Sequence, residues 1–159
     1  QFGHAVFSKY PIEAQRGRIY TAHGTHYRGL LETEIQVNGE TLYFYVTHWG
    51  LSEDERLSQA KQTLEWMGQR EGHQIIVGDF NAEPESPEIA LMLTKFHDAF
   101  DSADQAYTFK STSPVKRIDY IFGSPTVKFD HAQVLTSYAS DHLPIVAEVT
   151  FEQAIEQAK

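Results

Sequence analysis

The chain has 159 residues, of which 41% are hydrophobic and 13% aromatic, and its formal net charge is -9 at pH 7. This length and apolar content suit a single globular domain, residues 1–159, and exclude a chain that is disordered as a whole. The charge excludes a protein that holds nucleic acid or an anionic membrane through a general excess of Lys and Arg. It does not exclude a phosphate substrate, because a bound divalent cation can supply positive charge locally.

The sequence contains no cysteine, which excludes disulfides and thiol ligands for a metal. This composition is compatible with the cytoplasm and with secretion, so the compartment stays open. No apolar run is long enough to span a bilayer, and Gln1 begins the chain without a Met or a signal-peptide pattern. We therefore expect a processed or trimmed segment with no transmembrane span.

The first half of the chain alternates predicted strands with turns. Four strands are expected, at residues 4–8, 18–23, 30–37 and 41–47. Pro11 should end the first strand. The last two strands flank Asn38 and Gly39, a dipeptide that favours a tight hairpin because both residues tolerate positive φ. Residues 42, 44 and 46 should face one side of the sheet and residues 43, 45 and 47 the other, with His48 at the strand's end.

Two amphipathic helices and four further strands are predicted in the second half. Ser52 followed by Glu55 is a capping-box pattern, after which apolar residues recur at helical spacing until Gly72. Ser86 and Pro87 begin a second helix. The strands are expected at residues 74–77, 118–122, 128–135 and 143–149. The pattern as a whole is mixed α/β, with helices laid on a sheet.

Acidic and imidazole side chains gather at the ends of these strands. Asp79 follows the strand 74–77, Asn81 comes two residues later, and Asp141 and His142 precede the strand 143–149. Magnesium-type ions prefer oxygen ligands, so carboxylates and an amide converging from separate strands indicate a metal-assisted site that cleaves phosphoesters. An imidazole that titrates near neutrality can activate water there. The same residues could also form an ordinary strand end, turn and loop.

Two further positions have both a functional and a structural interpretation. Asp119 lies in an otherwise apolar strand, where a carboxylate is costly to bury unless it binds a metal or pairs with Arg117 or Lys116. His48 could donate to a phosphate oxygen, or it could simply pack against Trp49.

Four short motifs in a fixed order resemble those of the endonuclease/exonuclease/phosphatase superfamily, the deoxyribonuclease-like proteins. They are residues 47–49 (THW), 78–81 (GDFN), 117–120 (RIDY) and 140–144 (SDHLP). Residues 2–12 and 28–32 also resemble strands of that family, and the similarity extends to about Val149. The resemblance implies a deoxyribonuclease-I-like α/β fold, a mixed-sheet two-layer β-sandwich flanked by helices.

The resemblance also implies roles for the residues of these motifs. The expected catalytic residues are His48, Asp79, Asn81, Asp119, Asp141 and His142, and the expected ligands of Mg2+ or Mn2+ are Asp79, Asn81 and Asp141. His48 would polarise the phosphate, and either Asp79 or His142 would activate water. Asp119 would support the water-activating group. Arg28 is expected to contact a substrate phosphate.

The family pattern also contains an Asn and a Glu, the principal metal ligand, that precede the matched motifs. The chain begins after both, and Glu13, Glu32 and Glu34 lie in the wrong context to replace that Glu. We therefore expect the C-terminal part of an endonuclease/exonuclease/phosphatase domain without its N-terminal portion. That portion is an expected partner, and without it a sheet edge or face should be uncovered.

The predicted function is hydrolysis of a phosphodiester by metal-assisted attack of water, as in a nuclease. The expected substrate is a phosphate ester, such as nucleic acid or a phospholipid headgroup. Two alternatives stay open. One is a phosphoesterase of the same fold that acts on inositol phosphates or sphingolipids, since the fold does not fix the substrate. The other is a catalytically inactive binding module, which the missing Glu would permit.

Overall fold

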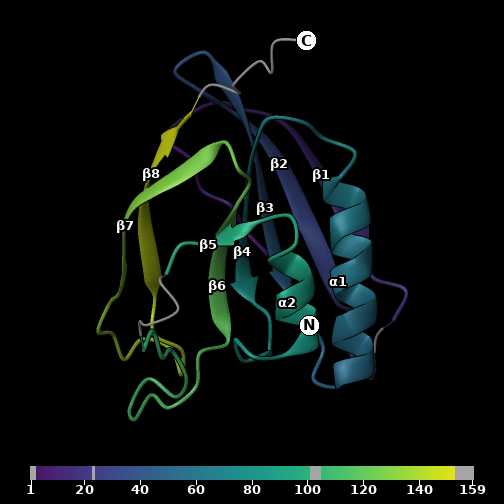
Figure 1. Cartoon of the computed structure of the whole chain (residues 1–159), viewed down its shortest axis with the longest axis vertical. Helices are drawn as coiled ribbons and strands as arrows, with labels where there is room; N and C mark the ends of the chain where they lie inside the picture. Colours follow the sequence, from purple (N-terminus) through teal and green to yellow (C-terminus); the bar gives the residue numbers. More distant parts are fainter. Residues whose placement is uncertain (1–2, 23, 101–104, 153–159) are drawn as a thin grey trace.

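A six-stranded mixed sheet is the main element of the computed structural model, which describes residues 3–22, 24–100 and 105–152. The strand order is β1-β2-β3-β4-β6-β5 (Figure 1). The strands are β1 (Ile12–Ile19), β2 (Gly29–Val37), β3 (Glu40–His48), β4 (His73–Asp79), β5 (His97–Asp98) and β6 (Asp119–Gly123). β3 and β4 run parallel, whereas the other neighbouring strands of this sheet are antiparallel.

Two helices cover one face of this sheet, and a two-stranded sheet lies over the other (Figure 1). The helices are α1 (Glu53–Met67) and α2 (Pro87–Met92), and the second sheet consists of β7 (Val127–Val134) and β8 (Ile145–Phe151). Ala60 and Ile89 of the helices share a core with Tyr45, while Ile145 of β8 shares a second core with Ile75. The expected α/β fold, a two-layer sandwich flanked by helices, is confirmed. No helix in the described part of the chain is both long and apolar enough to cross a membrane.

The N-terminal strand predictions were partly wrong. Residues 4–8 form no strand, and Phe7 among them is 96% exposed. Pro11 precedes a strand rather than ending one, because β1 begins at Ile12. The predicted strand 18–23 is the end of β1, and the chain leaves the sheet at Tyr20, whose buried hydroxyl lies 2.7 Å from Thr63 Oγ1 on α1. His23 lies outside the described residues.

The turn and cap predictions were correct at the hairpin and at α1. At α2, Ser86 occupies the N-cap position and Pro87 begins the helix, but Ser86 makes no side-chain capping hydrogen bond. Asn38 and Gly39 have φ values of 53° and 92° and join β2 to β3 as a hairpin. Ser52 and Glu55 form the complete capping box at the start of α1, although the helix ends at Met67, before the predicted Gly72. The last strand begins at Ile145 rather than at residue 143 because Pro144, which has no N–H, precedes it.

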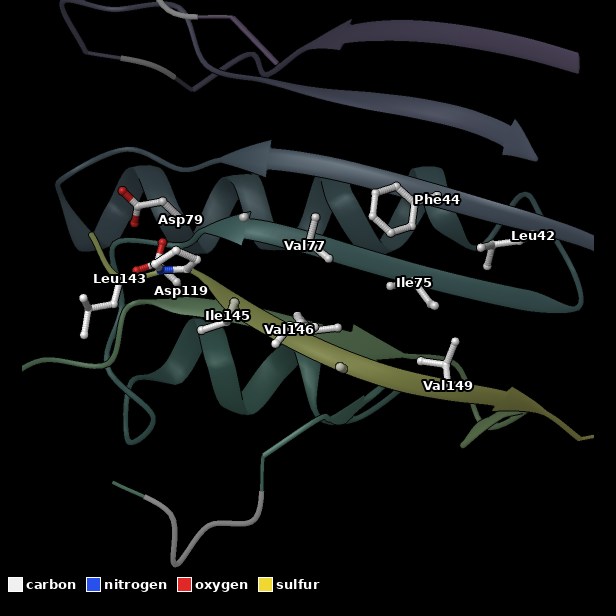
Figure 2. Close-up of a pocket in the computed structure, with 14 residues that line it drawn as sticks. Leu42, Phe44, Ile75, Val77, Asp79, Asp119, Leu143, Ile145, Val146 and Val149 are labelled. Atoms are coloured by element: carbon white, nitrogen blue, oxygen red, sulfur yellow. The ribbon is translucent and has the colours of Figure 1, made fainter. Parts of the chain in front are cut away.

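Part of the sheet face under β8 is open. A cavity of about 550 Å³ lies between β8 and the six-stranded sheet, with Asp79 and Asp119 at one end and apolar side chains along the rest (Figure 2). Val146 and Val149 on β8 are 37% and 39% exposed.

Candidate active site

Three neighbouring strands place functional side chains next to one another at the same end of the sheet. His48 at the end of β3 pairs with Asp79 at the end of β4, and Asp79 pairs with Asp119 at the start of β6. Adjacent strands lie about 4.7–4.9 Å apart. The parallel pairing of β3 with β4 and the antiparallel pairing of β4 with β6 therefore bring three separate motifs to one point.

The backbone around Asp79 fixes the direction of its carboxylate. Gly78 has a φ of 148°, and a Cβ there would lie only 1.9 Å from the carbonyl oxygen of Thr47. Only glycine therefore lets β4 approach β3 in this way. After the strand, Asn81 donates its backbone N–H to Asp79 Oδ1 at 2.8 Å, and its side-chain Nδ2 donates to the carbonyl of Trp49 at 2.9 Å.

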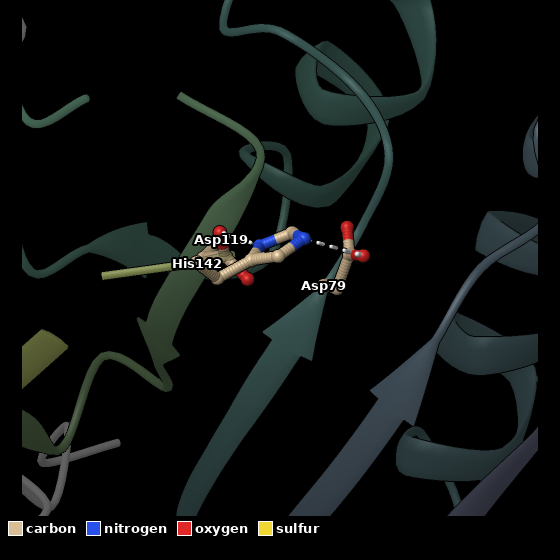
Figure 3. A group of neighbouring side chains, drawn as sticks. All are labelled: Asp79, Asp119 and His142. Carbon is tan, nitrogen blue, oxygen red and sulfur yellow. Dashed lines mark hydrogen bonds and ion pairs between the residues drawn. The ribbon is translucent and has the colours of Figure 1, made fainter. Parts of the chain in front are cut away.

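The His142 ring lies between two carboxylates (Figure 3). Its Nδ1 is 2.8 Å from Asp119 Oδ2, and its Nε2 is 3.9 Å from Asp79 Oδ2. The Nε2 atom of His48 approaches the same Asp79 oxygen to 3.2 Å. Asp79 thus faces the rings of His48 and His142, and the ring of His142 is also hydrogen-bonded to Asp119 on its opposite side.

Thr108 and Phe109 hold this histidine–aspartate pair in place. Thr108 is fully buried, and its Oγ1 donates to Asp119 Oδ2 at 2.5 Å. Its carbonyl accepts a hydrogen bond from Leu143 N–H at 2.8 Å, and the Phe109 ring lies 4.9 Å from the ring of His142. No local sequence pattern marks Thr108 as the partner of a carboxylate 11 residues away, so this residue was not among the predicted site residues.

The pKa values of the pair follow from burial and from neighbouring charges. Burial raises the pKa of Asp119, hydrogen bonds from Thr108 and His142 offset part of the rise, and the charge of Asp79 adds to it. Burial alone lowers the pKa of His142. The hydrogen bond that His142 Nδ1 donates to Asp119 and the negative charges of Asp119, Asp79 and Asp141 outweigh this effect, so the pKa of His142 lies above its usual 6.5.

The same three side chains offer ligand atoms for a metal. One atom each from Asp79, Asp119 and His142 lies within 4.8 Å of the others. Both carboxylates also have protein partners. Oδ2 of Asp119 has hydrogen bonds with Thr108 and His142, and Asp79 accepts from Asn81 N–H at Oδ1 and lies 3.2 Å from His48 Nε2 at Oδ2. Carboxylate oxygens suit Mg2+ or Mn2+, so the two carboxylates fit the expected ion, whereas an imidazole is a more usual ligand of zinc, copper or iron.

Asp141 lies apart from this group. It is exposed, and among the described residues the cluster of possible metal ligands consists of Asp79, Asp119 and His142. The carbonyl of Asp141 accepts a hydrogen bond from Ser111 N–H at 2.8 Å, which anchors the loop that carries His142. The metal-ligand roles of Asp141 and Asn81 stay predictions.

Asp119 does not form the alternative ion pair with Arg117 or Lys116, because these two residues pair with other carboxylates. Arg117 Nη2 instead binds both carboxylate oxygens of Asp98 at 2.6 Å. Lys116 lies 4.0 Å from Glu83. Asp98 belongs to β5, a two-residue strand that the sequence pattern did not indicate.

Arg28, the expected phosphate contact, lies on the other side of His48. It is buried, and together with His48 it lines a hollow of about 210 Å³ beside the carboxylates. Trp49 lies elsewhere, in the core on the helix side of the sheet.

Comparison with known protein families identifies the chain. The model of the endonuclease/exonuclease/phosphatase family matches residues 1–142, which include every motif residue from His48 to His142. The chain belongs to this family. Residues 1–142 also contain all the side chains that meet at the sheet edge.

One relative and two solved structures are similar to this chain. An uncharacterized protein of Escherichia coli strain K12, YbhP, is 30% identical over 161 residues, which cover 92% of this chain and 62% of that relative. A family protein from Bacteroides thetaiotaomicron has a similar structure, with a TM-score of 0.81, 20% identity and coverage of 91% and 65% of the two chains. A mannosyl-6-phosphatase from the same species has a TM-score of 0.79, 19% identity and coverage of 90% and 68%. The chain thus spans about 62% of the length of the curated relative.

Proposed function

We propose that this chain forms part of a divalent-metal-dependent hydrolase that cleaves a phosphodiester by attack of water. One observation carries the proposal. The carboxylates of Asp79 and Asp119 and the imidazole of His142 come from three separate motifs, and their ligand atoms lie within 4.8 Å of one another, beside the paired ends of β4 and β6. Membership of the endonuclease/exonuclease/phosphatase family supports a phosphate ester as the substrate.

In the proposed mechanism His142 is the general base. Asp119 holds Nδ1 at 2.8 Å, which leaves Nε2 facing the space beside Asp79. A water molecule there would lose a proton to Nε2 as its oxygen bonds to phosphorus and the bond to the leaving group breaks. The negative charge of Asp119 would stabilise the imidazolium that forms.

Asp79 and Asn81 would hold the cation, and His48 would donate to a non-bridging phosphate oxygen. The cation would act as a Lewis acid that stabilises the negative charge on phosphorus-bound oxygen in the transition state. Nδ2 of Asn81 is engaged by the carbonyl of Trp49, which leaves its amide oxygen as the atom available to the cation or substrate.

Hydrolysis of bis-p-nitrophenyl phosphate tests this function. The wild-type chain should release p-nitrophenol with Mg2+ or Mn2+ present, and EDTA should abolish the release. Asp79→Ala and His142→Ala should lower the rate by at least about a hundredfold, the low end of the contribution of a general base. Lys61→Ala, at an exposed position on α1, serves as the matched control. Turnover that persists in EDTA and in both variants would contradict the mechanism, and absent turnover would favour the binding module.

A further inference from the structure

A basic hollow lies next to the candidate active site. It has a volume of about 210 Å³ and is lined by His4, Tyr27, Arg28 and His48 together with two glycines and Ile19. None of these lining residues carries a carboxylate. In a chain with a formal net charge of -9, three basic side chains around one small space are a local exception.

The strand register places the hollow in line with the carboxylates. Ile19 of β1 pairs with Gly29 of β2, and the neighbouring Leu30 pairs with Thr47 of β3. His48 follows Thr47 and pairs with Asp79. Gly29 and Asp79 are therefore two strand spacings apart, and with strands about 4.7–4.9 Å apart their backbones are separated by roughly 9–10 Å.

His48 forms the wall between the two sites. Its Nε2 is 3.2 Å from Asp79 Oδ2, and its side chain also lines the hollow. A substrate group in the hollow would therefore be separated from the reacting ester by little more than one imidazole ring.

The electrostatics of the hollow favour an anion. Arg28 is only 9% exposed and carries a permanent positive charge. Burial lowers the pKa of His4, and the positive charges of His48 and Arg28 lower it further. The charge of Arg28 also interacts with that of Glu55, and His48 lies 3.2 Å from Asp79. A guanidinium with imidazole N–H donors matches the oxygens of a phosphate group.

We propose that this hollow binds a second phosphate group of the substrate, next to the ester that is cleaved, with His4 and Arg28 as its principal contacts. The inference rests on the proposed hydrolase function and narrows it to substrates that carry neighbouring phosphates.

Two chromogenic substrates that differ by one phosphate test the proposal. They are the p-nitrophenyl ester of thymidine 5'-phosphate and the same compound with an added 3'-phosphate. The wild-type chain should prefer the second in kcat/KM by at least about tenfold, the effect of one hydrogen bond to a charged group. His4→Gln should reduce this preference by a similar factor, whereas His131→Gln, at an exposed position on β7, should keep it.

The ratio of the two kcat/KM values distinguishes the occupants of the hollow. If the cleaved phosphate itself occupied it, His4→Gln would slow both substrates equally and the ratio would not change. An unchanged ratio, or no preference in the wild-type chain, overturns the proposal.

A binding measurement separates this proposal from the hydrolase function. In EDTA and at fixed pH, inorganic phosphate should shift the imidazole carbon and proton resonances of His4 in a saturable way, while sodium chloride of equal ionic strength should not. The His4→Gln variant assigns the signal. A saturable shift without turnover of either ester would support the anion site while contradicting the hydrolase. No shift would contradict the anion site whatever the turnover.

Discussion

Thr108 and Asp119 are joined by a 2.5 Å hydrogen bond between Oγ1 and Oδ2, on the same carboxylate oxygen that holds Nδ1 of His142. Thr108 is fully buried. The orientation of the proposed general base therefore depends on a threonine that contacts neither the cation nor the ester.

Thr108→Val should remove this bond while keeping the shape of the side chain. We expect the free energy of unfolding to fall by about 1.5–3 kcal/mol, the range for a hydrogen bond to a charged group. The kcat of the proposed hydrolysis should fall about tenfold to a hundredfold, because the His142 ring would be less well positioned. Thr108→Ser keeps the donor and should recover most of kcat. Urea unfolding and hydrolysis assays measure the two effects, and a Val variant as active as the Ser variant would contradict the role.

The pKa of His142 should lie above 6.5 and should fall in Asp119→Asn, because the substitution removes the negative charge beside Nδ1. A raised folded pKa means that this group stabilises the fold fully below the unfolded pKa of about 6.5 and that this contribution is lost as pH rises through the folded pKa. An NMR titration in EDTA measures the pKa. Asp130→Asn, at an exposed carboxylate on β7, is the control that should leave it unchanged.

The rate of the proposed hydrolysis should depend on pH through the same histidine. His142 accepts a proton only when neutral, so kcat/KM should rise as pH increases through its pKa. A rate that falls over this range would argue against His142 as the base.

Gly78→Ala should destabilise the protein by at least about 3 kcal/mol, the upper end for one strained backbone position. The added Cβ would lie 1.9 Å from the carbonyl oxygen of Thr47. Gly17 on β1 has open space around the same position, so Gly17→Ala is a matched control that should cost much less. Equal losses of stability in urea unfolding would show that the close approach of β3 and β4 is not required.

Arg56→Ala should destabilise the contact between the two helices by about 3–5 kcal/mol. Arg56 of α1 donates through Nε to Glu88 of α2, a carboxylate with no exposed side-chain surface. Removal of the arginine leaves that buried charge without its partner. Arg16→Ala, at an exposed position on β1, should change the free energy of unfolding by no more than about 0.5 kcal/mol. Similar effects of the two substitutions on urea unfolding would contradict this account.

Local sequence patterns correctly predicted the features that depend on residues close together in the chain. The hairpin at Asn38 and Gly39 and the capping box at Ser52 depend on residues close in the chain, and both were found. The strand at residues 4–8 was wrong, because alternation alone does not supply a partner strand. β5 was missed because a strand of two residues is too short to show an alternation of apolar and polar residues.

The residues of the site were predictable from local motifs, but the contacts between them were not. The motifs named Asp79, Asp119 and His142, which the structure brings together, but they did not indicate which carboxylate holds the imidazole. Thr108 was missed as well. Arg28 was expected to contact a substrate phosphate, but the hollow that it forms with His4 and His48 was not foreseen. Both depend on contacts between distant segments, and the strand register that creates those contacts cannot be read from spacing along the chain.

Mn2+ binding, followed by NMR on protein labelled at histidine, tests the central claim most directly. Mn2+ should broaden the resonances of His142 and His48 well before that of His131 on β7, and Asp79→Asn should abolish this selectivity. Broadening that is equal at all three histidines, or that is unchanged by Asp79→Asn, would contradict a cation site at the edge formed by β3, β4 and β6.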